Sequence, residues 1–277
     1  MIVQGRRRIL FLVLGIAAAW CMVFPVYWLV ITSLKPASET FATPPTFWPH
    51  TLDLSSYTSN ILHNATLGVY ILNSLQLAVE VVVWTLLLSI PAAYALARLP
   101  IKGKQVATLV LLVLQMFPSI MLATPLFIVF THLGLIDSLF AVSIAVSTRT
   151  IPFTILVLRP FFLGLPPDLE EAAAVDGASR LGTLVRIILP ISMPAVVTVS
   201  ALNFLSGWGE FLFSLTLISS DTRRPLALGL YSYIGQYFTR WNDLMAVSVV
   251  ASLPALVVLI AAQRYLVSGL LVGSTKG

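Results

Sequence analysis

Long hydrophobic runs separated by short polar segments make up most of this chain. A helix needs roughly 20 apolar residues to cross the hydrocarbon core of a bilayer. Six runs reach that length, and they cover approximately residues 9–32, 67–97, 106–131, 138–162, 194–218 and 244–267. The pattern therefore predicts an all-α integral membrane protein with six transmembrane helices.

The composition supports this interpretation. Hydrophobic residues make up 58% and charged residues 10% of the 277 positions, whereas a soluble domain has about 45–50% and about 25%. A soluble all-α protein is disfavoured because too few polar residues are present to cover its surface. Neither an internal repeat nor a low-complexity linker divides the sequence, so we expect one transmembrane domain over residues 1–277. The single cysteine, Cys21, excludes a disulfide framework, and three scattered histidines suggest no metal site.

Lysine and arginine residues fall unequally on the two sides of the predicted helices. Membrane proteins carry an excess of these residues on the cytoplasmic side. With a cytoplasmic N-terminus, eleven of them lie on that side, and Lys35, Arg223, Arg224 and Arg240 lie on the other. We therefore expect both termini in the cytoplasm. The first run follows three arginines, as in a signal peptide, but it is about twice as long as a signal peptide's apolar region, so a retained helix is expected.

One compact polar segment, residues 166–194, interrupts the hydrophobic pattern on the expected cytoplasmic side. Its charged residues are Asp168, Glu170, Glu171, Asp176, Arg180 and Arg186.

The order of residues in this segment predicts two short helices around a bend. Asp168 is placed to cap the first helix, and Glu171 would complete a capping box. Gly177 supplies the permissive backbone of a bend. Ser179 is placed to cap the second helix, which Pro190 would end or kink.

Small and apolar side chains in the segment suggest contact with another surface. The alanines at 172–174 leave little bulk on the first helix, so a partner could approach its backbone closely. Leu181, Leu184, Ile187 and Ile188 form an apolar stripe at helical spacing. These features alone leave two interpretations open: a docking surface for a partner protein, or an amphipathic loop resting on the membrane.

The same segment follows the sequence pattern E-A-A-x-x-D-G-A…I-x-L-P. The matching residues are Glu171-Ala172-Ala173, Asp176-Gly177-Ala178 and 187–190 (I-I-L-P), with Pro194 beyond them. This pattern resembles the signature loop (EAA motif) of the permease subunits of bacterial ABC importers. The resemblance extends over essentially the whole chain, including "FPVYWLVITSLKP", "WGEFLFSLTL" and "QRYLVSGLLVGSTKG". It is strongest to the maltose-type sugar permease that ends in a Gly-rich tail.

The resemblance implies the type I ABC importer permease fold, in the cytoplasmic (inner) membrane of a bacterium. An extracytoplasmic solute-binding protein would deliver an oligosaccharide, a disaccharide or a polyol derivative, although a glycerophosphate-type compound stays open. The other implied partners are a second homologous permease subunit in a heterodimer, two ATPase subunits and membrane lipid, with no nucleic acid.

The chain itself is expected to be neither an enzyme nor a cofactor-binding protein. It lacks the phosphate-binding pattern G-x-x-x-x-G-K-[ST]. ATP and Mg would therefore bind to the partner ATPase.

The resemblance also implies site residues, because in this family the loop forms a coupling helix that docks on the ATPase. The corresponding residues are Glu170, Glu171, Ala172, Ala173, Asp176, Gly177, Ala178, Leu184 and Pro190. Leu184 stands where the family usually has phenylalanine, and it would keep an apolar anchor at the docking surface. In the tail, Gly273, Lys276 and Gly277 are expected to contact the ATPase.

Three ionisable residues, Glu80, Arg149 and Glu210, fall within the predicted helices. At 1.5 Å per residue they lie about 14–20 Å below the outer surface. Charges at this depth are costly and face a partner or water. We therefore expect Arg149 to pair with Glu210 or Glu80 in or beside a central cavity, where Trp208 would pack or stack on a sugar ring. The same charges permit an alternative function, a self-contained secondary transporter or channel.

Overall fold

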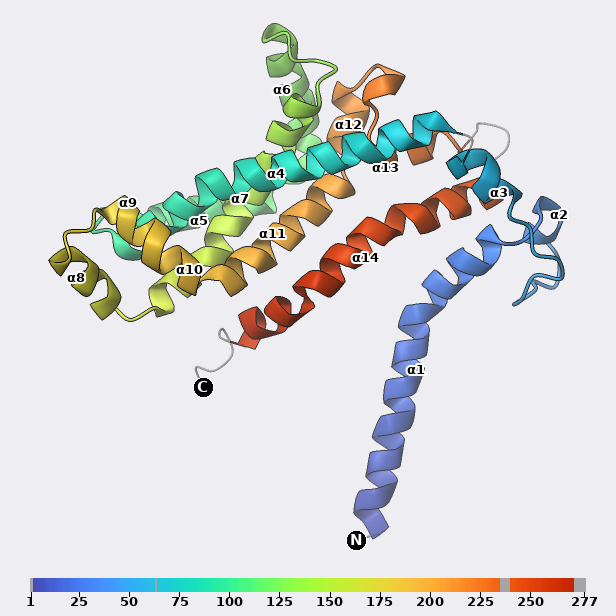
Figure 1. Ribbon diagram of the computed structural model, residues 1–277, viewed down its shortest axis with the longest axis horizontal. Helices are drawn as coiled ribbons and strands as arrows, with labels where there is room; N and C mark the ends of the chain where they lie inside the picture. Colours follow the sequence, from blue (N-terminus) through green and yellow to red (C-terminus); the bar gives the residue numbers. More distant parts are fainter. Residues whose placement is uncertain (1, 63, 235–239, 272–277) are drawn as a thin grey trace. The chain divides into compact units, whose positions relative to one another are not determined.

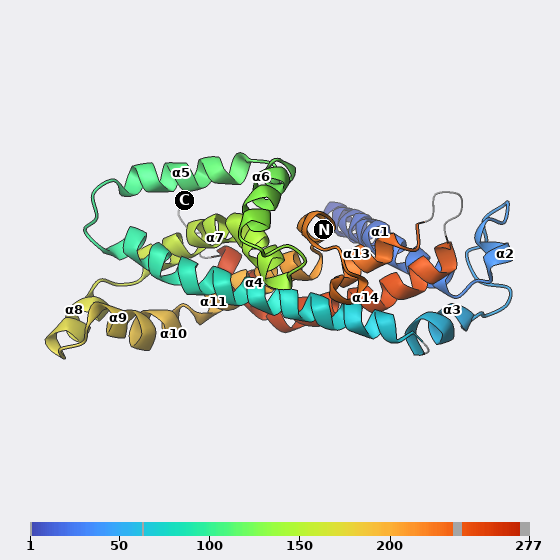
Figure 2. The same ribbon diagram turned by 90° about the horizontal axis from the view of Figure 1, so that it is seen from above.

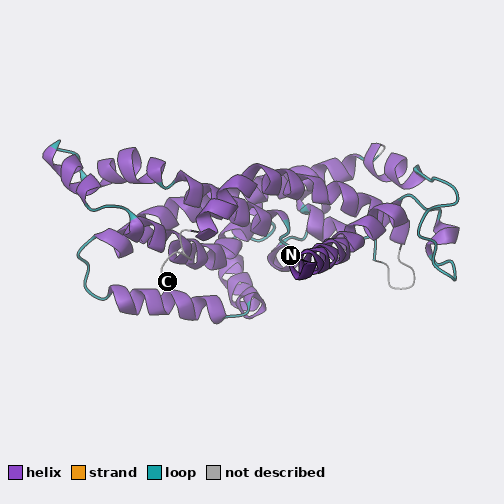
Figure 3. Ribbon diagram, turned by 90° about the horizontal axis from the view of Figure 1, so that it is seen from below, coloured by secondary structure: helices purple, strands orange, loops and turns teal. Residues whose placement is uncertain are grey.

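The computed structural model describes residues 2–62, 64–234 and 240–271, and it contains helices but no β-strand in these ranges (Figure 3). The chain divides into two compact units. Unit 1 comprises Met1–Leu67 and Leu230–Leu253, and unit 2 comprises Gly68–Gly229 and Pro254–Gly277. The prediction of an all-α protein is confirmed, whereas the prediction of one domain over residues 1–277 stays a prediction.

Unit 1 begins with a long apolar helix. Helix α1 (Ile2–Ser33) contains the first predicted span, and only 6% of its most apolar window is buried. A polar loop follows, in which the ammonium group of Lys35 donates to the carbonyl of Thr46 at 2.5 Å. The remaining helices of the loop region are α2 (Ala37–Thr40), α3 (Ser55–Tyr57) and the π-helix η1 (Thr58–Leu62).

Unit 2 is built around α7 (Leu139–Gly164), which packs against both α5 (Lys104–Met116) and α11 (Met193–Trp208) (Figures 1 and 2). Burial reaches 61% in the most apolar window of α7, because several helices of unit 2 pack around it. One core cluster joins the first half of α7 to α4 (Ala65–Arg98), α6 (Ser119–His132) and α12 (Leu212–Leu217). A second cluster joins its last half to the end of α4 and to α11.

Small and hydroxyl-bearing side chains let the helices of unit 2 approach closely. A Cβ atom on Gly207 would lie 2.7 Å from the Cα atom of Ala78, so the backbones of α11 and α4 are in direct contact there. Thr85 and Thr150 share a buried 2.6 Å hydrogen bond between α4 and α7. Such small residues and interhelical hydrogen bonds replace the hydrophobic effect as a packing force inside a bilayer.

Two of the six predicted spans are not single straight helices. The third is broken between α5 and α6 with a bend of 96°. Pro118 explains the break, because a proline disfavours helical backbone in the preceding residue, and Phe117 is extended with a ψ of 123°. The fifth is interrupted after Trp208, and α12 starts only at Leu212.

The described chain thus offers four long apolar helices, or up to six spans if two bent pairs, α5 with α6 and Arg180–Ile191 with α11, each cross once. The count of six spans and the orientation of the termini stay predictions. Unit 2 also contains the short 3-10 helix η3 (Asp221–Arg223) and most of α13 (Leu226–Tyr231), and α14 (Trp241–Leu271) begins in unit 1 and ends in unit 2.

Candidate functional site: a polar loop and a cavity within unit 2

The polar segment forms a chain of short helices beyond the end of α7. These are α8 (Asp168–Val175), α9 (Arg180–Thr183), the π-helix η2 (Leu184–Ile188) and α10 (Leu189–Ile191). Gly177 forms the bend between α8 and α9 with a φ of 76°, a conformation that glycine adopts without strain. The Ser179 hydroxyl accepts a 3.1 Å hydrogen bond from the Gly182 amide and caps α9. The predicted bend and the predicted serine cap are therefore confirmed.

One detail of the predicted loop was wrong. Asp168 lies inside the first turn of α8, and the cap position is Pro167, whose side chain cannot accept a hydrogen bond. The carboxylates of that turn instead stabilise α8 by their attraction to the positive end of its helix dipole. The second helix ends at Ile191, one residue after Pro190, and the chain bends by 83° at Ser192, so the predicted end or kink at this proline is confirmed. A π-helical turn before Pro190 displaces the carbonyl with which its ring would clash.

One side of the loop is fixed to the helices of unit 2. The Arg98 guanidinium at the end of α4 donates to the Leu165 carbonyl, and its Nε lies 3.9 Å from the Glu170 carboxylate. Tyr94 also faces Glu170 from α4. Leu184 is 4% exposed in the second core cluster, so it supports the loop from within and does not form the predicted surface anchor.

The opposite side of the loop is open. Val175 is 88% exposed and Leu181 is 68% exposed, and both are apolar. The predicted coupling residues divide between the two sides. Exposed are Glu171, Ala172, Asp176, Gly177 and Pro190; half-buried are Glu170 and Ala178; buried are Ala173 and Leu184. Sequence reasoning missed Val175, an apolar residue beside the Asp176-Gly177 bend.

The predicted tail contacts Gly273, Lys276 and Gly277 lie outside the described residues.

The three ionisable residues of the predicted spans do not form the expected ion pair. Among the described residues, no ion pair within 4.0 Å involves Arg149. The Glu210 carboxylate is 7% exposed and accepts a 2.6 Å hydrogen bond from the Phe213 amide. Glu80 accepts a 2.8 Å hydrogen bond from the Gln76 side chain. Arg149 acts on Glu210 only through a longer-range attraction.

Arg149 instead borders a polar cavity of about 410 Å³ between α5, α7 and α11. Its side chain is exposed, and its carbonyl accepts a 2.8 Å hydrogen bond from Gln115. Phe153 lies one helical turn further along α7, and Ser206 faces the cavity from α11. Sequence reasoning identified Arg149 but missed Gln115, Phe153 and Ser206, since uncharged residues in a span carry no signal of their own.

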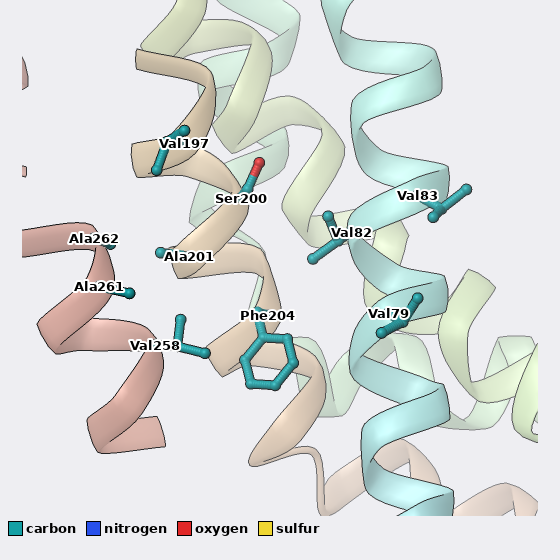
Figure 4. A pocket seen from close by; sticks show the side chains of 10 residues that line it. All are labelled: Val79, Val82, Val83, Val197, Ser200, Ala201, Phe204, Val258, Ala261 and Ala262. Atoms are coloured by element: carbon teal, nitrogen blue, oxygen red, sulfur yellow. The ribbon is translucent and has the colours of Figure 1, made fainter. Parts of the chain in front are cut away.

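Trp208 belongs to the packing of α11. It is 7% exposed, and its ring stacks on Phe204 at 6.1 Å with an angle of 9°. Phe204 also lines an apolar groove of about 340 Å³, to which α4, α11 and the last part of α14 contribute (Figure 4). The groove's one polar side chain, Ser200, donates to the Val196 carbonyl at 2.7 Å, so the groove offers no free polar group.

Comparison with known proteins places the chain in a transporter family. Residues 85–272 match the model of the family described as "Binding-protein-dependent transport system inner membrane component". The chain belongs to this family. It is the inner-membrane permease component of an ABC importer, and it is not an enzyme because ATP hydrolysis belongs to a separate subunit.

Individual relatives agree with this assignment. The chain is 34% identical to the sulfoquinovosyl glycerol transport system permease protein SmoH of Agrobacterium fabrum, over 92% of this chain and 89% of the relative. It is also 34% identical to the trehalose/maltose transport system permease protein MalG of Thermococcus litoralis, over 98% of each. Family membership decides against a self-contained secondary transporter.

A solved structure shows the same fold. A chain of a bacterial ABC transporter that imports the acidic polysaccharide alginate superposes with a TM-score of 0.80, with 24% identity over 95% of this chain and 96% of that one. The importer permease fold expected from the sequence is thus confirmed.

Proposed function

We propose that this chain is one of two homologous permease subunits that together form the pathway of a saccharide importer. A solute-binding protein outside the membrane delivers the saccharide, and two ATPase subunits inside bind ATP and Mg. The saccharide class is supported by the relatives, whose names specify sulfoquinovosyl glycerol and trehalose or maltose as cargo.

The α8–α10 loop is the element that couples this pathway to the ATPase. The observation that carries the proposal is the division of the loop into two sides. Arg98 and the buried Leu184 attach its inner side to α4 and the second core cluster, while Val175 and Leu181 project from its outer side. A partner that engages the outer side can therefore displace the helices to which the inner side is attached.

The proposed cycle follows from this attachment. Closure of the two ATPase subunits on ATP moves the docked loops, and the helices of unit 2 move with them, so that the pathway opens to the outside. ATP hydrolysis separates the ATPase subunits and returns the pathway to the inward-open state. The Glu171 and Asp176 carboxylates, both exposed, offer ionic contacts to basic groups of the ATPase.

A pull-down from native membranes with a matched pair of variants tests this function. Gly177→Asp adds charge and backbone strain at the loop bend. Gly103→Asp does the same between α4 and α5, because Gly103 also has a positive φ, 82°, and open space where a Cβ would lie. The tagged chain should retain an ATPase, a second permease and a solute-binding protein. The ATPase should be lost from Gly177→Asp and retained by Gly103→Asp.

Two results would contradict the proposal. If the chain is recovered alone, the multi-subunit importer is wrong. If both variants lose the ATPase equally, the loop is not the specific docking element.

A further inference from the structure

The position of Arg149 requires an explanation, because arginine is costly in the middle of a membrane. It is the eleventh residue of α7, about 15 Å along a helix that is long enough to span a bilayer. An arginine at this depth normally faces a counter-ion or water. The guanidinium of Arg149 forms no hydrogen bond or ion pair with another described residue, and it borders the 410 Å³ cavity.

Neither of the two carboxylates expected to neutralise Arg149 forms an ion pair with it. Glu210 is buried at the break after α11 and is held by the Phe213 amide. Glu80 accepts from Gln76 on its own helix through Oε1, and its Oε2 is buried without a hydrogen-bond partner. Neither carboxylate is among the residues that line the cavity, and Arg149 is the one charged residue there. The cavity is therefore electropositive.

The remaining lining residues suit a sugar. Phe153 follows Arg149 by four positions, so both side chains lie on the same face of α7. An aromatic ring packs against the apolar C–H face of a sugar ring, while a guanidinium binds a planar or tetrahedral anion through two parallel hydrogen bonds. Gln115 and Ser206 add polar groups at the cavity wall.

We propose that Arg149 is a specificity-determining residue that binds the anionic group of an acidic saccharide as it passes through this cavity. The anionic group is a carboxylate or a sulfonate. Arg149 then forms a direct ion pair only while cargo is bound, which avoids a permanent pair that would compete with the substrate. This inference rests on the proposed saccharide importer and adds the charge of its substrate.

Matched pairs of saccharides test the proposal in the complete importer reconstituted into liposomes with its binding protein. The first pair is sulfoquinovosyl glycerol and glucosyl glycerol, which differ by a sulfonate in place of one hydroxyl. The second pair is a mannuronate disaccharide and mannobiose. ATP-dependent uptake is measured for wild type, Arg149→Gln and Arg149→Lys, and retention of the ATPase is measured on each purified complex.

The wild type should take up at least one anionic saccharide about tenfold faster than its neutral counterpart. Arg149→Gln should lose at least about tenfold of that uptake, so that the ratio of anionic to neutral uptake falls to about one. Arg149→Lys should retain an intermediate preference, since a lysine keeps the charge but not the paired hydrogen bonds.

Several outcomes would overturn the inference. One is a wild type that prefers neutral saccharides or takes up none of the four. Another is an Arg149→Gln complex that keeps its preference. A third is an Arg149→Gln complex that falls apart while Arg149→Lys stays intact, which would assign Arg149 to an ion pair with the second permease. If the wild type takes up neutral saccharides in an ATP-dependent way but does not prefer the anionic ones, the proposed importer is supported and this inference is wrong.

Discussion

Single residues fix the closest approaches and the tightest turns of this permease. Gly207 is the clearest case in the packed helices, since its missing side chain lets α11 touch the backbone of α4 at Ala78. Asp137 is the clearest case in the connections. It has a positive φ of 60° and its carboxylate accepts hydrogen bonds from the amides of Ser219 and Ser220.

Gly207→Ala should destabilise the protein, whereas Gly68→Ala should not. The added Cβ at 207 would meet backbone atoms at 2.7 Å, so the two helices must separate. Overpacking of this kind costs about 1–3 kcal/mol. Gly68 has nothing within 4 Å, and alanine there improves helix propensity by about 1 kcal/mol. The apparent melting temperature of the detergent-purified protein should fall for the first variant and stay or rise for the second; equal shifts would contradict the close approach.

The Asp137 carboxylate should make stability depend on pH in the acidic range. The Ser220 backbone N–H, helped by the Ser220 hydroxyl, the Ser219 amide and Arg223, holds the pKa of Asp137 below its usual 3.8 despite partial burial. A lowered pKa means that the contribution is complete above pH 3.8 and is lost as the pH falls through the folded-state pKa. Wild type should therefore be more stable than Asp137→Asn from pH 5 to 7, and the gap should shrink below pH 4. A gap that does not change with pH would show that the carboxylate's charge is not involved.

At the scale of elements, α7 organises unit 2. Its first half packs against α6 and α12, and its second half packs against the end of α4, α11 and Leu184 of η2. Both the polar cavity and the inner side of the α8–α10 loop therefore depend on one helix. Polar contacts such as the 3.0 Å hydrogen bond from Asn203 to Thr154 hold α11 against it.

Ser179→Ala should loosen α9 without disturbing the spans. Loss of an N-cap costs about 1 kcal/mol, which corresponds to about fivefold faster local opening. Hydrogen exchange of the amides from Arg180 to Leu184 should accelerate by that factor. Ser252→Ala is the control, because Ser252 bonds to a carbonyl within α14 and caps no helix. Unchanged exchange at α9 would show that the cap contributes nothing to the loop.

At the scale of the whole molecule, the loop and the Asp137 connection lie at the two ends of α7. This helix has 26 residues, or about 39 Å, which exceeds the bilayer core of about 30 Å. The two connections are therefore expected on opposite sides of the membrane, with the loop in the cytoplasm.

Cysteine labelling in intact cells tests this topology. Cys21 is the chain's single cysteine, so it is first replaced by serine. Leu133→Cys then places an exposed thiol in the connection before α7, and Gly164→Cys places one at the last residue of α7. A membrane-impermeant maleimide should label Leu133→Cys in intact cells and Gly164→Cys only after permeabilisation. The reverse pattern would invert the orientation, and labelling of both would mean that α7 does not cross.

The sequence predicts more of this fold than of its site. Hydrophobic length identifies the four long helices, because the bilayer imposes that length on any helix that crosses it. Hydrophobic length does not reveal the 96° bend at Pro118, since a straight helix and a broken one show the same apolar pattern.

The site was predictable where backbone geometry demands a residue type. Gly177 and Ser179 were identified correctly because a left-handed bend and a helix cap each require a particular chemistry. The burial of Leu184 was not predicted, because the spacing of an amphipathic stripe does not indicate which surface the stripe contacts. The supposed partners of Arg149 were also wrong, since equal depth in the membrane does not place residues on facing sides of their helices.

Helix α1 has a consequence for how this chain can diverge over evolutionary time. Its most apolar window is 6% buried, compared with 61% for α7. Within this chain, selection on α1 therefore acts mainly on hydrophobicity, and many apolar exchanges are neutral. Substitutions in α7 instead alter packed contacts. The family model begins at residue 85, well beyond α1. We therefore expect α1 to be the span in which orthologues conserve length and hydrophobicity but share little sequence identity.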